Sequence, residues 1–158
     1  MAEYVYNPVQ TVQPNQPILL RDSIPCNKGY VYHRNESGIL TLRGVVNNQC
    51  GCFARYQVTF NGNIAIPDGG TVGPIAIAIA ISGEPILTSR AIVTPAATAT
   101  DPVTTENFFN VTSTAIIDVP RCCCETVSVE NVSEPLTPAD PAPAILVQNA
   151  NLTVTRIA

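Results

Sequence analysis

The residues best suited to chemistry in this chain are its six cysteines. They form three groups along the sequence, namely Cys26 alone, the pair Cys50 and Cys52, and the consecutive run Cys122, Cys123 and Cys124. Thiols form disulfides, ligate soft metal ions or pack as small apolar side chains. Which of these roles applies depends on the spacing of the groups and on the secondary-structure elements that carry them.

An even number of cysteines fits a disulfide framework. Two bridges between the Cys50/Cys52 pair and the Cys122–Cys124 run, with one further bridge from Cys26, would use every thiol. Each bridge would close a long loop and stabilise the chain by about 2–4 kcal/mol. Free buried thiols are the competing interpretation, because a reducing cytoplasm keeps cysteines reduced, and bridges between subunits are a third. The sequence leaves the pairing and the redox state open.

A zinc site is less well matched to this spacing. Structural zinc sites combine Cys-x-x-Cys pairs or mixtures of cysteine and histidine around a tetrahedral ion, whereas Cys50 and Cys52 are separated by a single residue. On a strand, Cys122 and Cys124 would face one side and Cys123 the other, so at most two thiols of the run share a ligand set. Zinc would need the two groups to lie opposite each other. We predict no metal ion and no other cofactor.

The sequence offers little for catalysis. His33 is the only histidine, and no cysteine or carboxylate stands at a catalytic-motif spacing from it. The acidic residues are scattered among turn signals, and turn chemistry accounts for most of them. Residues 68–70, Asp-Gly-Gly, are a hairpin signal rather than a phosphate-binding loop. We predict that the protein is not an enzyme.

The composition favours strands and indicates a covered surface. Apolar residues make up 46% of the chain and charged residues only 13%, so other chains, most simply copies of the same chain, are expected to cover part of it. A net charge of −4 without a basic run argues against nucleic-acid binding. The N-terminus lacks a signal-peptide pattern, and the longest apolar stretch, residues 74–81, is far too short to span a bilayer. We therefore expect no membrane association.

Apolar and polar residues alternate along most of the chain, which predicts about eight to ten short strands. The clearest examples are residues 29–34, 38–46, 52–66, 107–119, 124–132 and 144–158. Residues 95–106 and 134–143 are rich in Pro, Ala and Thr and are predicted to be loops. This pattern is typical of an all-β antiparallel sandwich or barrel.

The run from residue 75 to residue 81 alternates isoleucine with alanine. Neither face of such a strand is polar, so both faces are predicted to be buried. Isoleucine fills the interior of the sandwich, and the small alanine side chains allow close approach by another sheet or another subunit. Coverage by a loop of the same chain is the alternative, since a bare flat strand would aggregate. The candidate interface residues are Ala76, Ala78 and Ala80.

Several stretches together resemble the tumour-necrosis-factor/C1q-like jelly roll. They are ARYQVTFNGNIAIPDGGTVG, IAIAIAISGEPI, STAIIDVPRCCCETVSVEN and the terminal ANLTVTRIA. The likeness covers residues 38–158 and is strongest to a bacterial and phage branch that includes the C-terminal domains of collagen-like spore-surface glycoproteins. Residues 14–44 are also similar to short virion proteins of tailed phages. Two departures are the absence of a Gly-X-Y tract and the three cysteines where the family commonly has a glycine turn.

The resemblance implies an antiparallel jelly roll of about 8–10 strands over residues 26–158, and a tight homotrimer with one sheet of each protomer packed around a three-fold axis. In that homotrimer, the alanine face becomes the candidate trimer interface, and the cysteines hold the assembly rigid by bridge or by burial. Residues 1–25 contain Pro8, Pro14 and Pro17 and are predicted to form an extended N-terminal arm that docks by strand addition.

The resulting hypothesis is a non-enzymatic, homotrimeric decoration or cement protein on the capsid surface of a tailed bacteriophage, with its arm on the major capsid protein. The alternative is a trimeric receptor-like or glycan-binding module on a cell, spore or fibre surface, which would recognise host-surface glycan through its loops. A weaker third is a metal- or redox-responsive cysteine protein. The two long loops contain no aromatic residue, and this favours decoration over glycan binding.

Overall fold

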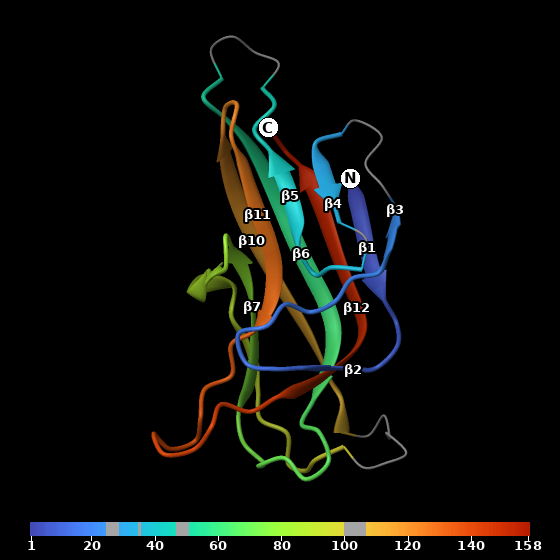
Figure 1. Cartoon of the computed structure of the whole chain (residues 1–158), viewed down its shortest axis with the longest axis vertical. Helices are drawn as coiled ribbons and strands as arrows, with labels where there is room; N and C mark the ends of the chain where they lie inside the picture. The colour runs from blue at the N-terminus through green and yellow to red at the C-terminus, as the bar shows by residue number, and fades with distance from the viewer. Residues whose placement is uncertain (25–28, 35, 47–50, 100–106) are drawn as a thin grey trace.

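The chain folds as a sandwich of two antiparallel β-sheets (Figure 1). This computed structural model describes residues 1–24, 29–34, 36–46, 51–99 and 107–158. A short 3-10 helix, η1 (Leu87–Ser89), lies between β8 and β9. No helix in the described part of the chain has the length and hydropathy needed to cross a membrane. The predicted all-β antiparallel sandwich is confirmed.

The first sheet has the strand order β10–β6–β12–β1–β3, and β2 also pairs with β12. Its strands are β1 (Ala2–Tyr6), β2 (Gln10–Val12), β3 (Asp22–Ile24), β6 (Phe53–Ala65), β10 (Phe109–Pro120) and β12 (Ile145–Arg156). The three long strands β10, β6 and β12 lie side by side and form most of this layer (Figure 1). Strand β10 is the last strand on its side, since β6 is its only partner among the described strands.

The second sheet has the order β4–β5–β11–β7–β8, and β9 also pairs with β7. Its strands are β4 (Val31–His33), β5 (Leu40–Arg43), β7 (Ile75–Ile81), β8 (Glu84–Pro85), β9 (Ala91–Val93) and β11 (Cys124–Asn131). Strands β7 and β8 are joined by Ser82 and Gly83, whose φ angles are 52° and 80°. Two left-handed residues between paired strands match the twist of a tight hairpin.

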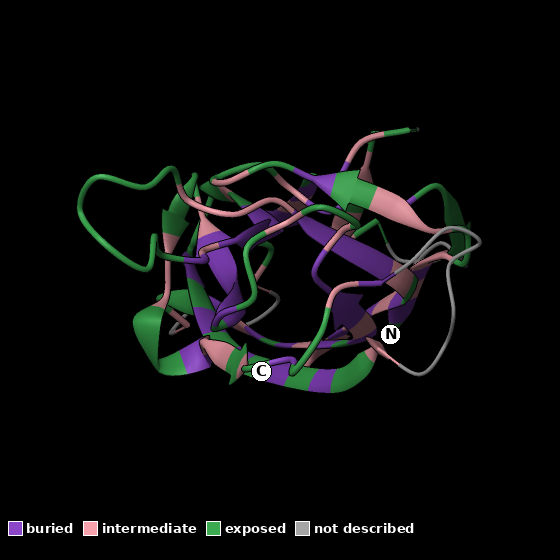
Figure 2. Ribbon diagram, turned by 90° about the horizontal axis from the view of Figure 1, so that it is seen from below, coloured by how far each residue is buried: buried purple, intermediate pink, exposed green. Residues whose placement is uncertain are grey.

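The hydrophobic core lies between the two sheets, as the buried ribbon in Figure 2 shows. Along β6, every second residue from Ala54 to Phe60 is fully buried, whereas Gln57 and Asn61 are exposed. The Tyr56 hydroxyl donates a hydrogen bond of 2.5 Å to the carbonyl of Arg43 on the opposite sheet. This bond satisfies the buried hydroxyl and ties the layers together.

Strand β7 is buried on both faces, as the isoleucine–alanine alternation predicts. Ile75, Ile77 and Ile79 belong to the core cluster between the sheets. The alanines between them are at most 1% exposed. A strand of this kind needs no polar face because its neighbours cover both sides.

The predicted extended arm is not confirmed. Strand β1 lies between β12 and β3 within the first sheet, and Ala2 and Tyr4 are each 1% exposed. Ile18 and Leu20, further along, are fully buried. The prolines lie in the connections between the strands, so they do not interrupt the pairing of β1 with β12. The boundary proposed between residues 25 and 26 falls outside the described residues.

Candidate functional site

The outer surface of strands β10, β6 and β12 carries mostly uncharged polar side chains, and we call it the Thr/Asn face. Its members point away from the core on alternate positions and are Gln57, Thr59, Asn61, Asn63, Asn110, Thr112, Thr114, Ile116, Thr153 and Thr155. Neighbouring strands place like side chains opposite each other. The hydroxyls of Thr59 and Thr114 are 3.2 Å apart, and the Asn61 amide donates to the Thr112 hydroxyl at 2.9 Å.

Ile116 is the exception on this face. Its side chain is 63% exposed and stands in the register row of Gln57, near the middle of β10. Full burial of a large apolar side chain under a partner contributes about 1.5–3 kcal/mol of favourable free energy. The Thr/Asn face is therefore nearly uncharged and carries one exposed, large apolar residue on its edge strand, β10.

An ion pair borders the face towards the end of β10. Arg55 donates from Nε to Asp118 Oδ1 and from Nη2 to Asp118 Oδ2, both at 2.7 Å. The hydrogen bonds from Arg55, with its positive charge, hold the pKa of Asp118 below its ordinary value, and the same contact raises the pKa of Arg55. The Arg55 guanidinium also lies 5.0 Å from the centroid of the Phe53 ring. This edge of the face is polar, charged and rigidly paired.

The cysteine run lies in the turn that joins β10 to β11. Cys122 has φ 64° and Cys123 follows it within the turn, so only Cys124 belongs to a strand. The prediction that strand alternation separates the three thiols is therefore wrong, because a left-handed residue reverses the chain before the strand begins. All three thiols are exposed and free within the chain. The alternative prediction, that the thiols are buried, is therefore wrong for these three cysteines.

Hydrogen bonds hold this turn against two other segments. The amide of Cys122 donates to the Gly44 carbonyl at 3.0 Å, and the Gly44 amide donates to the Cys123 carbonyl at 2.8 Å. The Arg121 amide donates to the carbonyl of Cys52 at 2.9 Å. A side chain at Gly44 would collide with the Pro120 carbonyl, since an added Cβ would lie 1.8 Å from that oxygen. Glycine is required for this close approach.

The structure thus brings together two of the three predicted cysteine groups. Cys52 is exposed at the start of β6, beside the Cys122–Cys124 turn. Cys26 and Cys50 lie outside the described residues, so bridges that involve them stay a prediction. Among the described residues, no group of three or more His, Cys, Asp or Glu side chains has the geometry of a metal site.

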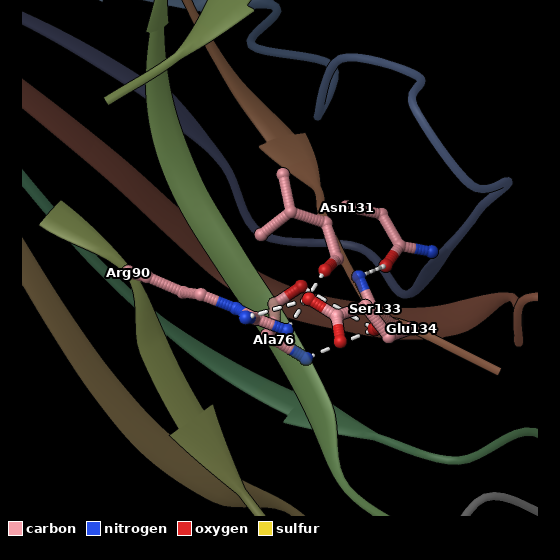
Figure 3. A network of polar contacts seen from close by, with 6 residues as sticks. Ala76, Arg90, Asn131, Ser133 and Glu134 are labelled. Carbon is pink, nitrogen blue, oxygen red and sulfur yellow. Dashed lines mark hydrogen bonds and ion pairs between the residues drawn. The ribbon is translucent and has the colours of Figure 1, made fainter. Parts of the chain in front are cut away.

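The predicted trimer-interface residues Ala76, Ala78 and Ala80 are 1%, 0% and 0% exposed within a single chain. They have no exposed area left to contribute to a subunit contact, so this prediction is corrected. The segment after β11 lies over the start of β7 instead (Figure 3). The Ala76 amide donates to the Ser133 hydroxyl at 2.9 Å. The alternative prediction, that another segment of the same chain covers the alanine face of β7, agrees with the structure.

Polar contacts hold that covering segment in place (Figure 3). Arg90 forms an ion pair with Glu134 at 2.8 Å and donates to the Val132 carbonyl at 3.3 Å. Asn131 is fully buried, donates to the carbonyls of Val12 and Pro143 at 3.0 and 2.9 Å, and accepts from the Ser133 amide at 3.0 Å. Its amide is satisfied on both sides, as a buried polar group must be.

The remaining titratable groups do not converge on a catalytic arrangement in the described part of the chain. His33 donates from Nε2 to the Ser37 carbonyl, 2.8 Å away, and its ring centroid lies 4.9 Å from that of Tyr4. A cleft of about 360 Å³ is lined by residues 67–71, 73–74, 134, 136 and 140–144. Two of its three carboxylates have partners, since Glu134 pairs with Arg90 and Asp140 accepts from the Thr137 hydroxyl at 2.8 Å. These are structural contacts of the loops.

Sequence reasoning missed the Thr/Asn face as a candidate surface. The signal was present, because Gln57 and Thr59 alternate with buried residues in β6, and Thr112, Thr114 and Ile116 do the same in β10. What the sequence did not disclose is that these two strands pair over their full lengths and place the side chains in common rows.

No family model matches the chain, and no curated protein matches its sequence. Among solved structures, the Eiger TNF domain from S. frugiperda is similar with a TM-score of 0.54 at 10% identity, over 100% of this chain and 92% of that one. The globular domain of zebrafish complement 1qA gives 0.44 at 10% identity, over 96% and 94%. The C-terminal domain of EclA, a sugar-binding protein, gives 0.40 at 11% identity, over 95% and 79%. Together with the two-sheet topology, the similarity to the Eiger TNF structure supports the predicted TNF-like jelly-roll fold.

Proposed function

We propose that the chain is a non-enzymatic structural protein that assembles into a homotrimer through its Thr/Asn face. The observation that carries this proposal is Ile116, a 63% exposed apolar side chain on the edge strand β10 of a nearly uncharged sheet face. The sequence resemblance implies three protomers, each packing one sheet around a common axis. The first sheet suits that role, because its long strands present a continuous outer face, whereas the alanines of β7 are already covered.

Light scattering on the purified chain tests the assembly. We expect a mass three times that of the 16.8-kDa chain at micromolar concentration. Thiol reductant should leave that mass unchanged, since the contact proposed is non-covalent. A clean monomer under the same conditions would contradict the proposal.

The assembly surface that we propose for this trimer is the capsid of a tailed bacteriophage, where it would act as a decoration or cement protein bound to the major capsid protein. Support comes from the resemblance of residues 14–44 to short virion proteins and from the low charge of the chain. Because β1 belongs to the sandwich, docking would use the body of the trimer rather than an extended arm. The proposal fails if the coding gene does not lie beside capsid and portal genes.

A trimeric glycan-binding module on a cell, spore or fibre surface is the second candidate, and one observation favours it. A shallow cleft of about 530 Å³ on the second sheet is lined by Tyr32, Arg34, Glu36, Ser37, Ile39 and Thr41. Tyr32 is 61% exposed there, and an exposed aromatic ring beside charged and hydroxyl groups suits a sugar ring with its hydroxyls.

A glycan array on the wild-type protein tests this candidate. Binding that Tyr32→Ala weakens about tenfold, the equivalent of about 1.4 kcal/mol, would support it. Leu87→Ala, which truncates an exposed side chain outside the cleft, is the control and should bind as the wild type does. If no glycan bound, glycan binding would be excluded and decoration would remain as the candidate function.

A further inference from the structure

Three exposed free thiols sit together at one end of the sandwich, in the turn between β10 and β11. Cys122, Cys123 and Cys124 each lie at the surface. Their backbone is fixed by the hydrogen bonds to Gly44 and to the Pro120 carbonyl, which accepts from the Cys123 amide at 3.0 Å. The thiols are therefore presented on a rigid support rather than on a loose loop.

The turn continues directly from β10, the edge strand of the Thr/Asn face. Asp118 and Pro120 occupy the last outward positions of β10, opposite Arg55 and Phe53 of β6. Strand β10 is the last strand of the first sheet among those described. In an assembly that packs this sheet against its copies, the turn of each protomer lies at the border of the subunit contact.

We propose that the Cys122–Cys124 turn is an intermolecular disulfide site that links protomers of the homotrimer to one another. This inference rests on the proposed assembly through the Thr/Asn face. In a ring of identical subunits, each chain contacts one neighbour with one surface and the other neighbour with a different surface. A fully closed covalent trimer therefore needs two distinct cysteines per chain, and a turn with adjacent exposed thiols supplies them.

The chemistry is thiol–disulfide exchange with a low-molecular-weight disulfide such as oxidised glutathione. A thiolate of one protomer attacks the small disulfide, forms a mixed disulfide and releases one glutathione thiolate. A thiolate of the neighbouring protomer then attacks the mixed disulfide, forms the inter-chain S–S bond and releases the second glutathione. Two protein thiols are oxidised, one glutathione disulfide is reduced, and the two thiol protons end on the two glutathiones or in solvent.

The test treats the purified protein with oxidised glutathione and separates it on a denaturing gel without reductant. We expect bands of covalent dimer and trimer that collapse to monomer on reduction. The variant Cys122→Ser/Cys123→Ser/Cys124→Ser should give neither band, although it retains the other cysteines. The variant Cys123→Ser/Cys124→Ser, with one thiol left in the turn, should stop at the dimer.

A position control separates a specific site from random oxidation of any surface thiol. Ala139 is exposed in the loop after β11, so Ala139→Cys in the triple-serine background restores a surface thiol elsewhere and should not restore the bands. Mass spectrometry on a mixture of ¹⁵N-labelled and unlabelled chains should find mixed-isotope disulfide peptides that contain residues 122–124.

The outcomes keep this inference separate from the proposed function. A trimeric mass in light scattering with monomer bands only would overturn the disulfide site and leave the assembly intact. Covalent bands that persist in the triple-serine variant would assign the cross-link to other cysteines and also overturn it. A monomeric mass in reductant, together with turn-dependent dimers only, would contradict the assembly instead.

Discussion

Two weakly charged surfaces of this sandwich differ in what covers them. The outer side of β7 presents Ala76, Ala78 and Ala80, and the chain's own segments bury all three. The Thr/Asn face of β10, β6 and β12 is not covered by the described part of the chain, and Ile116 on its edge strand β10 is 63% exposed. The more apolar of the two surfaces is thus covered within the protomer, and the more polar one is the surface that we propose for the subunit contact.

The difference shows that alternation identifies which side chains share a face but not what lies over that face. The cover on β7 depends on Ser133, which is 57 positions from Ala76 in the sequence, and on the ion pair that joins Arg90 to Glu134. Polar side chains also suit a contact between protomers that fold first and associate later, because each protomer has to stay soluble before assembly.

The largest expected effect comes from breaking the closed surface. Ala78 is fully buried and is paired in register with Glu130, so Ala78→Asp buries a second acid beside the first. We expect the free energy of unfolding in urea to fall by about 3–5 kcal/mol, the usual cost of an uncompensated buried charge.

Thr126→Asp is the matched control for that substitution. Thr126 is an exposed residue of the neighbouring strand β11, and its replacement should change the unfolding free energy by less than about 0.5 kcal/mol. If Ala78→Asp kept the stability of the wild type and became monomeric, the alanines would be a subunit contact after all.

A smaller effect is expected from removing the anchor of the covering segment. Asn131→Ala deletes the hydrogen bonds to Val12, Pro143 and Ser133. At about 0.5–1.5 kcal/mol for each bond, the loss of stability should be about 2–4 kcal/mol. Asn7→Ala, at an exposed position, should be nearly neutral in the same urea titration, and equal losses for the two variants would mean that the buried amide has no special role.

The smallest effect concerns the border of the open surface. Because the pKa of Asp118 is lowered in the folded state by Arg55, the pair contributes stability above the ordinary carboxyl pKa of 3.8 and loses it as the pH falls towards the lowered value. Asp118→Asn should therefore reduce the melting temperature slightly at pH 7 and converge with the wild type in strong acid. A constant difference at every pH would exclude the ion pair as its source.

The sequence predicted the two-sheet fold well because the alternation of β6, β10 and β12 is regular over their full lengths. It did not predict that β1 pairs with β12, because Pro8, Pro14 and Pro17 indicate an extended segment while the apolar Ala2 and Tyr4 that pair with β12 form too short a pattern to indicate a strand. It failed for Cys122 because a left-handed turn residue leaves no trace in an apolar–polar pattern. The Thr/Asn face, our proposed subunit surface, could not be predicted because Thr and Asn in strands are typical of solvated faces as well.

The central claim is that the open Thr/Asn face holds the subunits together, and a pair of matched substitutions tests it most directly. Ile116→Arg places a charge on this face, and Ile92→Arg places the same charge on β9 of the other sheet, where the isoleucine is 54% exposed. Light scattering should give a monomer for Ile116→Arg and a trimer for Ile92→Arg. A trimer for Ile116→Arg, or a monomer for Ile92→Arg alone, would contradict the account.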